Sequence, residues 1–118
     1  MESAMETVTL TVASRTAVRQ RMRNAFAGKK QGAQIAFETP ELLFEVMTTK
    51  RWEIIRVLTG AGPVSIREAA RRIGRDVHAV HRDIHALLKT GVLRKTEEGA
   101  IIFPFDAVHL DAVLKAAE

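Results

Sequence analysis

Residues 63–103 read PVSIREAARRIGRDVHAVHRDIHALLKTGVLRKTEEGAIIF, and this stretch decides the predicted fold. It has the pattern of two short helices joined by a tight turn. Ser65 is a typical helix N-cap, and Glu68, three residues later, completes a capping box. We therefore expect the first helix to begin at Ile66 and to end at Gly74, because glycine favours the left-handed conformation that closes a helix.

A second helix is predicted directly after this turn, with Asp76 as its N-cap and Gly91 at its end. Its apolar residues recur at the spacing of one buried helix face: Val77, Val80, Ile84, Leu87 and Leu88. The other face carries residues that a hydrophobic core does not require: His78, Ala79, Arg82, His85 and Lys89. This second face is expected to contact solvent or a partner.

A two-stranded hairpin is predicted immediately after the second helix. Residues 92–96 and 100–103 are expected to pair across a three-residue loop in which Gly99 adopts a positive φ. Helix, turn, helix and hairpin, in this order, are typical of a winged helix-turn-helix, which presents a helix to the major groove of DNA. The ordered series favours DNA binding, although a capping box alone is a weak signal.

The N-terminal part, residues 1–38, is expected to form a strand, a helix and a second strand. Apolar residues alternate with threonines over residues 7–12, which predicts a half-buried strand. A helix is expected over residues 15–27 and a second strand over residues 34–38. Because so small a unit cannot cover both faces of its own sheet, we assign it to dimerisation or partner binding.

The rest of the chain, residues 39–118, is expected to be the DNA-binding domain. Thr39 and Pro40 predict a helix start. A short helix over residues 41–47 and a second helix, capped at Thr48 or Thr49 and running to about residue 59, are expected to form the hub of the core. After the hairpin, Asp106 is expected to cap a C-terminal helix whose apolar residues are Val108, Leu110, Val113 and Leu114. The predicted fold class is α+β, mainly α: a winged helix-turn-helix with an N-terminal strand-helix-strand extension.

Composition narrows the class of protein. With 118 residues, of which 47% are hydrophobic, the chain is long enough for one compact domain with an appendage. It has no cysteine, which excludes disulfides, thiol catalysis and thiolate metal sites. No apolar run has the length of a transmembrane span, and the first residues lack a signal-peptide pattern. We therefore expect a cytoplasmic protein without a membrane partner.

Charge is distributed unevenly along the chain. The formal net charge is +4, but residues 15–36 hold six cationic residues and no acid, and residues 65–96 hold eight against three acids. Residues 97–118 hold one base and five acids. Basic zones separated from acidic ones suggest a surface that faces a polyanion, the alternative being an ordinary solvated face.

The second helix of the motif carries the candidate base-reading residues, because residues near its start reach base edges. Arg82 has the donors for a bidentate contact to guanine, Ala79 allows close approach to a thymine methyl, and His78 can bond to a base or a phosphate. The candidate phosphate contacts are Ser65, Arg67, Arg71, Arg75, Arg94 and Lys95.

Other residues of this helix have different expected roles. His81 is expected to pack at the margin of the buried stripe, and Asp83 to pair with Arg82, Arg75 or a backbone group. His81 and His85 lie four residues apart, but no cysteine or HExxH pattern accompanies them, so no metal site is predicted. The chain has no glycine-rich phosphate loop, no nucleophile elbow and no paired-carboxylate constellation with an accompanying histidine. We therefore predict no enzyme, no catalytic residues and no cofactor.

A resemblance to a known family covers residues 37–105. The residues that carry it are Phe37-Glu38 with Pro40 and Leu42, Arg51, Ser65-Ile66-Arg67-Glu68 with Ala70, and Gly74-Arg75-Asp76 followed by Val80-His81-Arg82-Asp83 and Leu87. On these residues the chain resembles small MarR-like winged helix-turn-helix proteins of prokaryotes, described as DNA-binding proteins or as antitoxins encoded beside small toxin genes. The resemblance implies DNA binding and autoregulation of a toxin–antitoxin operon.

The sequence thus leads to a hypothesis and an alternative. The hypothesis is a homodimeric, sequence-specific transcription regulator that binds double-stranded DNA, acts as an autorepressor, and is the antitoxin of a cognate toxin protein. The alternative is a winged-helix protein-interaction module that neutralises a toxin or another partner without a DNA role.

Overall fold

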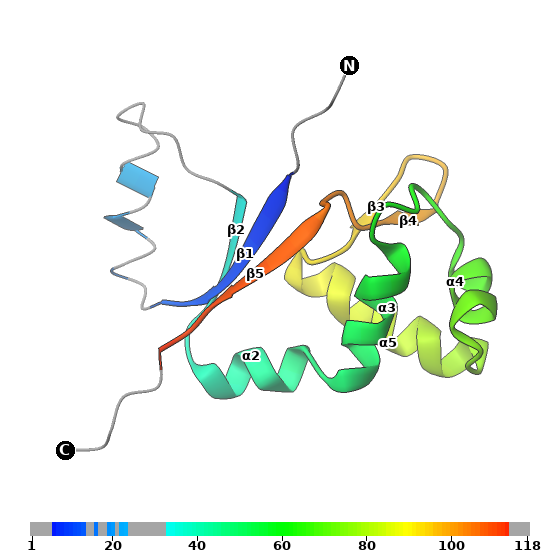
Figure 1. Cartoon of the computed structure of the whole chain (residues 1–118), viewed down its shortest axis with the longest axis horizontal. Coiled ribbons are helices and arrows are strands. Elements are labelled where there is room, and N and C mark those ends of the chain that lie inside the picture. The colour runs from blue at the N-terminus through cyan, green and yellow to red at the C-terminus, as the bar shows by residue number, and fades with distance from the viewer. Residues whose placement is uncertain (1–5, 14–15, 17–18, 21, 24–32, 114–118) are drawn as a thin grey trace.

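The computed structural model describes residues 6–13, 16, 19–20, 22–23 and 33–113 (Figure 1). This part of the chain is a small α+β structure. The strands are β1 (Thr7–Val12), β2 (Ala33–Phe37), β3 (Arg94–Lys95), β4 (Ile101–Ile102) and β5 (Ala107–Asp111). The helices are α2 (Pro40–Val46), α3 (Thr49–Leu58), α4 (Ile66–Ile73) and α5 (Val77–Thr90).

A three-stranded parallel sheet joins the two ends of the described chain. Its strand order is β2-β1-β5, and in this register Leu10 of β1 lies opposite both Ile35 and Leu110. Val8 and Leu10 are buried, as the alternating pattern of β1 predicts. The strands predicted over residues 7–12 and 34–38 are therefore confirmed, the second shifted by one residue.

The helix predicted between β1 and β2 falls largely outside the described residues. Within the predicted range 15–27, residues 16, 19–20, 22 and 23 are described, and they have helical conformation. A connection between parallel neighbours must cross over from one end of the sheet to the other, which is the geometry that a strand-helix-strand unit requires.

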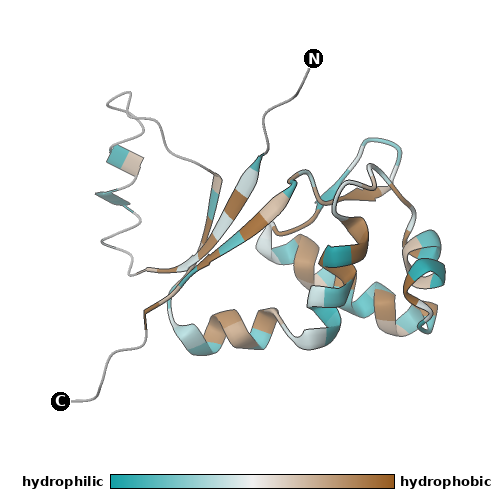
Figure 2. Cartoon of the chain, viewed as in Figure 1, coloured by the Kyte–Doolittle hydropathy of each residue, from teal (hydrophilic) through white to brown (hydrophobic). Residues whose placement is uncertain are grey.

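The predicted C-terminal helix is wrong, because residues 107–111 form β5 and pair with β1. Val108 and Leu110 are two residues apart, which is the spacing of a strand, whereas Leu110, Val113 and Leu114 have the spacing of a helix. The free edge of β1 selects the strand. Asp106 does not cap a helix. Its carboxylate accepts a hydrogen bond from the Glu6 amide at 2.9 Å, and its own amide donates to the Glu6 carbonyl. Figure 2 shows the alternation of hydrophobic and hydrophilic residues along β5.

The two central helices begin where the sequence predicts. The Thr39 hydroxyl accepts a hydrogen bond from the Leu42 amide, and Pro40 occupies the first position of α2. The Thr48 hydroxyl accepts a bond from the Arg51 amide and caps α3. In Figure 1, α3 begins shortly after the end of α2 and runs in a different direction.

One continuous core connects the sheet to the helices. Its fully buried residues come from β1, from α3 and α5, and from the segment around the β3–β4 hairpin: Val8, Leu10, Ile54, Leu58, Val80, Ile84, Leu87, Leu93 and Ile101. This core contains residues from both sides of residue 38. The division of the chain into two domains at that point stays a prediction. In the part of the chain that the structure describes, no helix has both the length and the apolar character that a membrane crossing requires.

Candidate nucleic-acid interface

The first helix of the motif, α4, is capped as expected but uses its capping-box glutamate differently. The Ser65 hydroxyl accepts a hydrogen bond from the Glu68 amide at 3.0 Å. The Glu68 carboxylate pairs with Arg71 and with the Arg72 Nε atom, which lies 2.7 Å from it. A hydrogen bond from Arg71, which has the largest effect, and a second one from Arg72 lower the pKa of Glu68 to about 2. This acid is therefore ionised at neutral pH and offsets two neighbouring cations.

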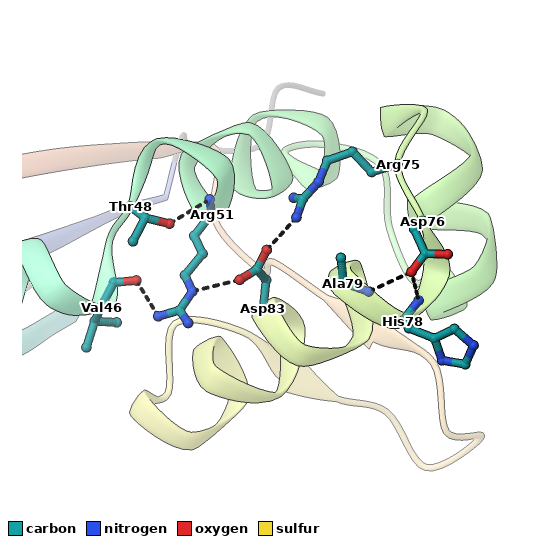
Figure 3. A network of polar contacts seen from close by, with 8 residues as sticks. All are labelled: Val46, Thr48, Arg51, Arg75, Asp76, His78, Ala79 and Asp83. Atoms are coloured by element: carbon teal, nitrogen blue, oxygen red, sulfur yellow. Dashed lines mark hydrogen bonds and ion pairs between the residues drawn. The ribbon is translucent and has the colours of Figure 1, made fainter.

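The turn between the helices has the predicted geometry. Gly74 adopts a φ of 78°, the left-handed conformation in which a side chain would be strained. The Asp76 carboxylate then accepts hydrogen bonds from the amides of His78 and Ala79, at 3.1 and 3.2 Å (Figure 3). Asp76 thus satisfies two amides at the start of α5, and its charge is directed at the helix end.

Helix α5 has the two faces that its sequence predicts. Val80, Ile84 and Leu87 are fully buried, whereas the residues on the opposite face are exposed: His78, Arg82, His85 and Lys89. Ala79 is half-buried at the edge of this face. Because α5 is held by its buried stripe, the exposed face is presented on a rigid element rather than on a loop.

Asp83, the single acid of α5, is turned toward the protein rather than toward the exposed face. Its carboxylate accepts a hydrogen bond from the Arg51 Nε of α3 at 3.1 Å and from the Arg75 guanidinium of the turn at 2.8 Å (Figure 3). Arg51 also donates to the Val46 carbonyl at 2.9 Å. We call these residues, Arg51, Arg75 and Asp83, the clamp. It connects the end of α2, α3, the turn and α5.

The clamp is largely withdrawn from solvent. Its three side chains are 15–19% exposed. Burial raises the pKa of Asp83, but the hydrogen bonds and charges of Arg75 and Arg51 outweigh this and lower it below its ordinary value. The expected pairing of Asp83 with Arg75 is confirmed. Its pairing with Arg51 was missed, because the two residues are 32 positions apart and no local pattern connects them.

The hairpin follows α5 as predicted, with shorter strands. Arg94 and Lys95 of β3 pair antiparallel with β4, and Gly99 in the loop has a φ of 86°. Ile101 also exchanges two backbone hydrogen bonds with Val64, at 2.8 and 2.9 Å, which ties the hairpin to the segment before α4. The Arg94 guanidinium lies over the ring of Phe105, 5.5 Å from its centre.

The candidate phosphate contacts fall into two groups. Ser65 caps α4, Arg71 pairs with Glu68, and Arg75 belongs to the clamp, so these side chains already have protein partners. One nitrogen of Arg75 is buried without a partner among the described residues. In contrast, Arg67 and Lys95 are exposed, and within the described part of the chain neither they nor Arg82 and Lys89 have an acidic partner.

All three acids of residues 65–96 are thus occupied. Glu68 is paired with two arginines, Asp76 caps α5, and Asp83 is held by the clamp. Among the described residues, four exposed cations of α4, α5 and β3 have neither an acidic partner nor a ring contact, whereas the hairpin loop after β3 carries two exposed acids, Glu97 and Glu98. We call the four cations, Arg67, Arg82, Lys89 and Lys95, the basic face.

His81 departs from its expected role. It does not pack among neighbouring helices but is exposed, and its Nε2 atom lies 3.1 Å from that of His85. The stripe that fills the core contains Val80 and Ile84, and His81 projects to one side of it. Among the described residues, no group of three or more His, Cys, Asp or Glu side chains converges to hold a metal ion.

Comparison with known proteins assigns a family. The chain matches the HVO_A0114 family over residues 46–110, just over half of its length, and it belongs to that family. The match begins at the end of α2 and contains the clamp, α4, α5 and the hairpin. No curated protein and no solved structure matches the chain.

Proposed function

We propose that α4, α5 and the β3–β4 hairpin form a winged helix-turn-helix, and that the protein is a sequence-specific DNA-binding transcription regulator. In this proposal α5 is the recognition helix and lies in the major groove, as in other helix-turn-helix proteins. The hairpin is the wing, and Lys95 contacts the phosphate backbone beside the groove.

The observation that carries this proposal is that α5, the proposed recognition helix, has no acid on its exposed face, because its one acid, Asp83, is turned inward. An ordinary amphipathic surface helix carries its charged residues on the solvent face, whereas α5 turns its one acid toward the protein. Here Asp83 is held by Arg51 and Arg75, so Arg82 and Lys89 remain on a face without negative charge. Such a face attracts a polyanion through counterion release, and Arg82 has the donors to read guanine.

The test is fluorescence anisotropy of the protein on the DNA upstream of its own coding sequence and on a scrambled duplex of equal length. We expect tight binding to the native fragment and a dissociation constant that rises steeply with salt. The slope of log affinity against log salt is expected to change by roughly 0.9 for each phosphate contact. Equal and weak binding to both duplexes contradicts a sequence-specific regulator.

Substitution of Arg82 tests the proposed recognition helix. We expect Arg82→Ala to lose about 1–3 kcal/mol of binding free energy on the cognate site, because a bidentate base contact is removed. The matched control is Arg56→Ala, an exposed arginine of α3 outside the motif, which is expected to bind as the unmodified protein does. Equal loss in both variants contradicts a specific role for Arg82.

Lys95→Ala separates phosphate contacts from base contacts. Removing a phosphate contact is expected to weaken binding to native and scrambled DNA alike and to reduce the salt slope by about one unit. A loss confined to the native fragment would place Lys95 among the base-reading residues instead.

We further propose that the regulator is a homodimer that represses its own operon and is the antitoxin of a neighbouring toxin. Two-fold symmetry would match half-sites roughly 10 base pairs apart, or a multiple of that spacing. Size-exclusion chromatography with light scattering should give twice the monomer mass. A strictly monomeric protein at micromolar concentration argues against the dimer, and a neighbouring gene product that neither binds nor is neutralised argues against the antitoxin role.

The alternative, a protein-interaction module, is favoured by a different observation. Phe44 of α2 is 71% exposed and Val113, beyond β5, is 70% exposed, so both apolar side chains are accessible to a partner. Under this alternative Phe44→Ser should abolish partner capture, and Arg82→Ala should have no effect on it.

A further inference from the structure

The exposed face of α5 contains a pair of histidines whose geometry the DNA-binding proposal does not explain. His81 and His85 lie one helical turn apart. Their Nε2 atoms are 3.1 Å from each other, and the ring centres are 4.2 Å apart with an angle of 38° between the rings. Both side chains are exposed, so packing does not force the rings together.

The separation of the two nitrogens matches that of two ligands on one metal ion. Imidazole nitrogens bound to Zn²⁺ at about 2.0–2.1 Å, with an angle of about 90–110° at the metal, lie about 2.8–3.4 Å apart. The observed Nε2–Nε2 distance falls inside this range. Residues four apart on a helix are neighbours, so the helix backbone itself holds the two rings on the same side.

We infer that His81 and His85 chelate one late first-row divalent cation, such as Zn²⁺ or Cu²⁺, through their Nε2 atoms. Without metal, the same atoms form a hydrogen bond in which one ring donates and the other accepts. To bind the metal, the donor ring changes to the tautomer that carries its proton on Nδ1, so that both Nε2 lone pairs are free, and the rings rotate to point these lone pairs at one ion. The separation of the two nitrogens is already that of the metal-bound pair.

The surroundings leave space for the other ligands of the metal. Both rings are exposed, so solvent can reach the paired Nε2 atoms. An open hollow of about 560 Å³ borders His85 on the side of Ala86, Leu88 and Lys89, away from His81. Because no third protein ligand converges there within the described structure, water would complete the coordination shell. Two imidazoles predict modest affinity, and Lys89, one turn beyond His85, lowers it further by charge repulsion.

The donor set also predicts which metals bind. Imidazole nitrogen suits Cu²⁺, Zn²⁺ and Ni²⁺, and affinity is expected to be highest for Cu²⁺. Mg²⁺ requires oxygen ligands and is expected not to bind. This order distinguishes a histidine chelate from non-specific attraction to carboxylates.

The experiment is isothermal titration calorimetry of the full chain with zinc chloride, copper sulfate and magnesium chloride. We expect one Cu²⁺ or Zn²⁺ per chain, tighter for Cu²⁺, and no heat from Mg²⁺ at the same concentrations. His85→Ala and His81→Ala should each weaken Zn²⁺ binding at least tenfold, and Lys89→Ala should strengthen it. Because both histidines are exposed, circular dichroism of the variants should match that of the unmodified protein.

The controls are the other two histidines. His78→Ala, on α5 but one turn earlier, and His109→Ala, on β5, should bind Zn²⁺ as the unmodified chain does. Unchanged Zn²⁺ affinity in His85→Ala overturns the inference, as does the absence of one-to-one Cu²⁺ binding in the unmodified protein. Loss of Zn²⁺ binding in His109→Ala with retention in His85→Ala would also overturn it.

Discussion

Among the individual residues, Asp83 has two roles in the structure. Its contacts to Arg51 and Arg75 join α3 and the turn to α5, and they withdraw the one negative charge of α5 from the exposed face. The same carboxylate thus positions the helix and leaves the basic face uniformly cationic. Arg75, which the sequence suggests as a phosphate contact, is instead a structural partner of this acid in the free protein.

Removal of this carboxylate should destabilise the fold. We expect Asp83→Asn to lower the free energy of unfolding by about 2–4 kcal/mol, because two largely buried guanidinium groups lose their anion. Urea denaturation followed by Trp52 fluorescence measures the change. The matched control is Glu53→Gln, an exposed acid of α3, which should change stability by less than about 0.5 kcal/mol. Equal effects would show that the clamp contributes nothing specific.

The clamp also predicts a pH dependence. The folded-state pKa of Asp83 lies below its ordinary value of 3.8, so the unfolded chain takes up this proton first as the pH falls. The contribution of Asp83 to stability is therefore complete at neutral pH and is lost as the pH falls below 3.8 toward the folded-state pKa. Between about pH 7 and about pH 3, the free energy of unfolding should fall less for Asp83→Asn than for the unmodified protein, as measured by urea denaturation. Glu68, whose pKa is about 2, also takes up a proton at low pH. The same measurement on Glu68→Gln therefore gives the part of the pH dependence that comes from Glu68.

At the scale of elements, α5 is the helix whose limits are most strongly determined. Asp76 bonds to two amides at its start, and Gly91 closes its end with a φ of 86°. Between them the buried stripe sets the rotation of the helix about its axis, and the clamp sets its position beside α3. The exposed face of α5 follows from these three constraints together.

The cap of α5 provides the test at this scale. Asp76→Ala should lower the free energy of unfolding by about 0.5–2 kcal/mol, because two amides at the start of the helix lose their acceptor. Asp76→Ser, which keeps a capping oxygen, should recover most of that loss. Urea denaturation of the three proteins measures both changes, and a serine variant as unstable as the alanine variant would contradict a capping role.

At the scale of the whole molecule, the parallel sheet and the helices share one core. Leu10, at the centre of the sheet, is 1% exposed, whereas Leu110, its register partner on β5, is 54% exposed. The shared core predicts that a destabilising substitution in the sheet also destabilises the helices. Trp52 on α3 is a reporter for this effect, because it packs against the core cluster.

Substitution of this leucine pair tests the connection. Leu10→Ala should cost about 2–5 kcal/mol, the usual range for a buried leucine, and Leu110→Ala should cost much less. Trp52 fluorescence and helical circular dichroism should lose their signals in one coincident transition in both variants. If Leu10→Ala unfolds the sheet while the Trp52 transition stays in place, the N-terminal part is an independent domain.

Much of the helical part was predictable because its signals are local. The caps at Thr39, Ser65 and Asp76 act within three residues, and the left-handed glycines at 74, 91 and 99 act on their own backbone. The buried stripe of α5 was equally readable, since one face of a helix is set by a spacing of three to four residues. The exposure of Arg82 and Lys89 follows from the same pattern by exclusion.

Contacts between distant positions were not predictable in this way. The C-terminal segment became β5 because β1 offers an unpaired edge, and nothing within residues 106–113 encodes that edge. Likewise, the partner of Asp83 on α3 and the exposure of His81 depend on how the helices pack against one another. The apolar residues of the C-terminal segment have strand spacing at 108 and 110 and helical spacing from 110 to 114, and only a neighbouring strand can decide between the two.

The amino-acid sequence by itself determined the limits of α2 to α5, the turn at Gly74, the hairpin loop and the cationic composition of the motif. Each of these depends on interactions between residues a few positions apart, which are close in space whatever the rest of the chain does. The tertiary structure alone decided the strand at the C-terminus, the burial of Asp83 between two arginines and the resulting absence of an acid from the exposed face of α5. These depend on segments far apart in sequence, and their free energy is available only after the chain has brought them together.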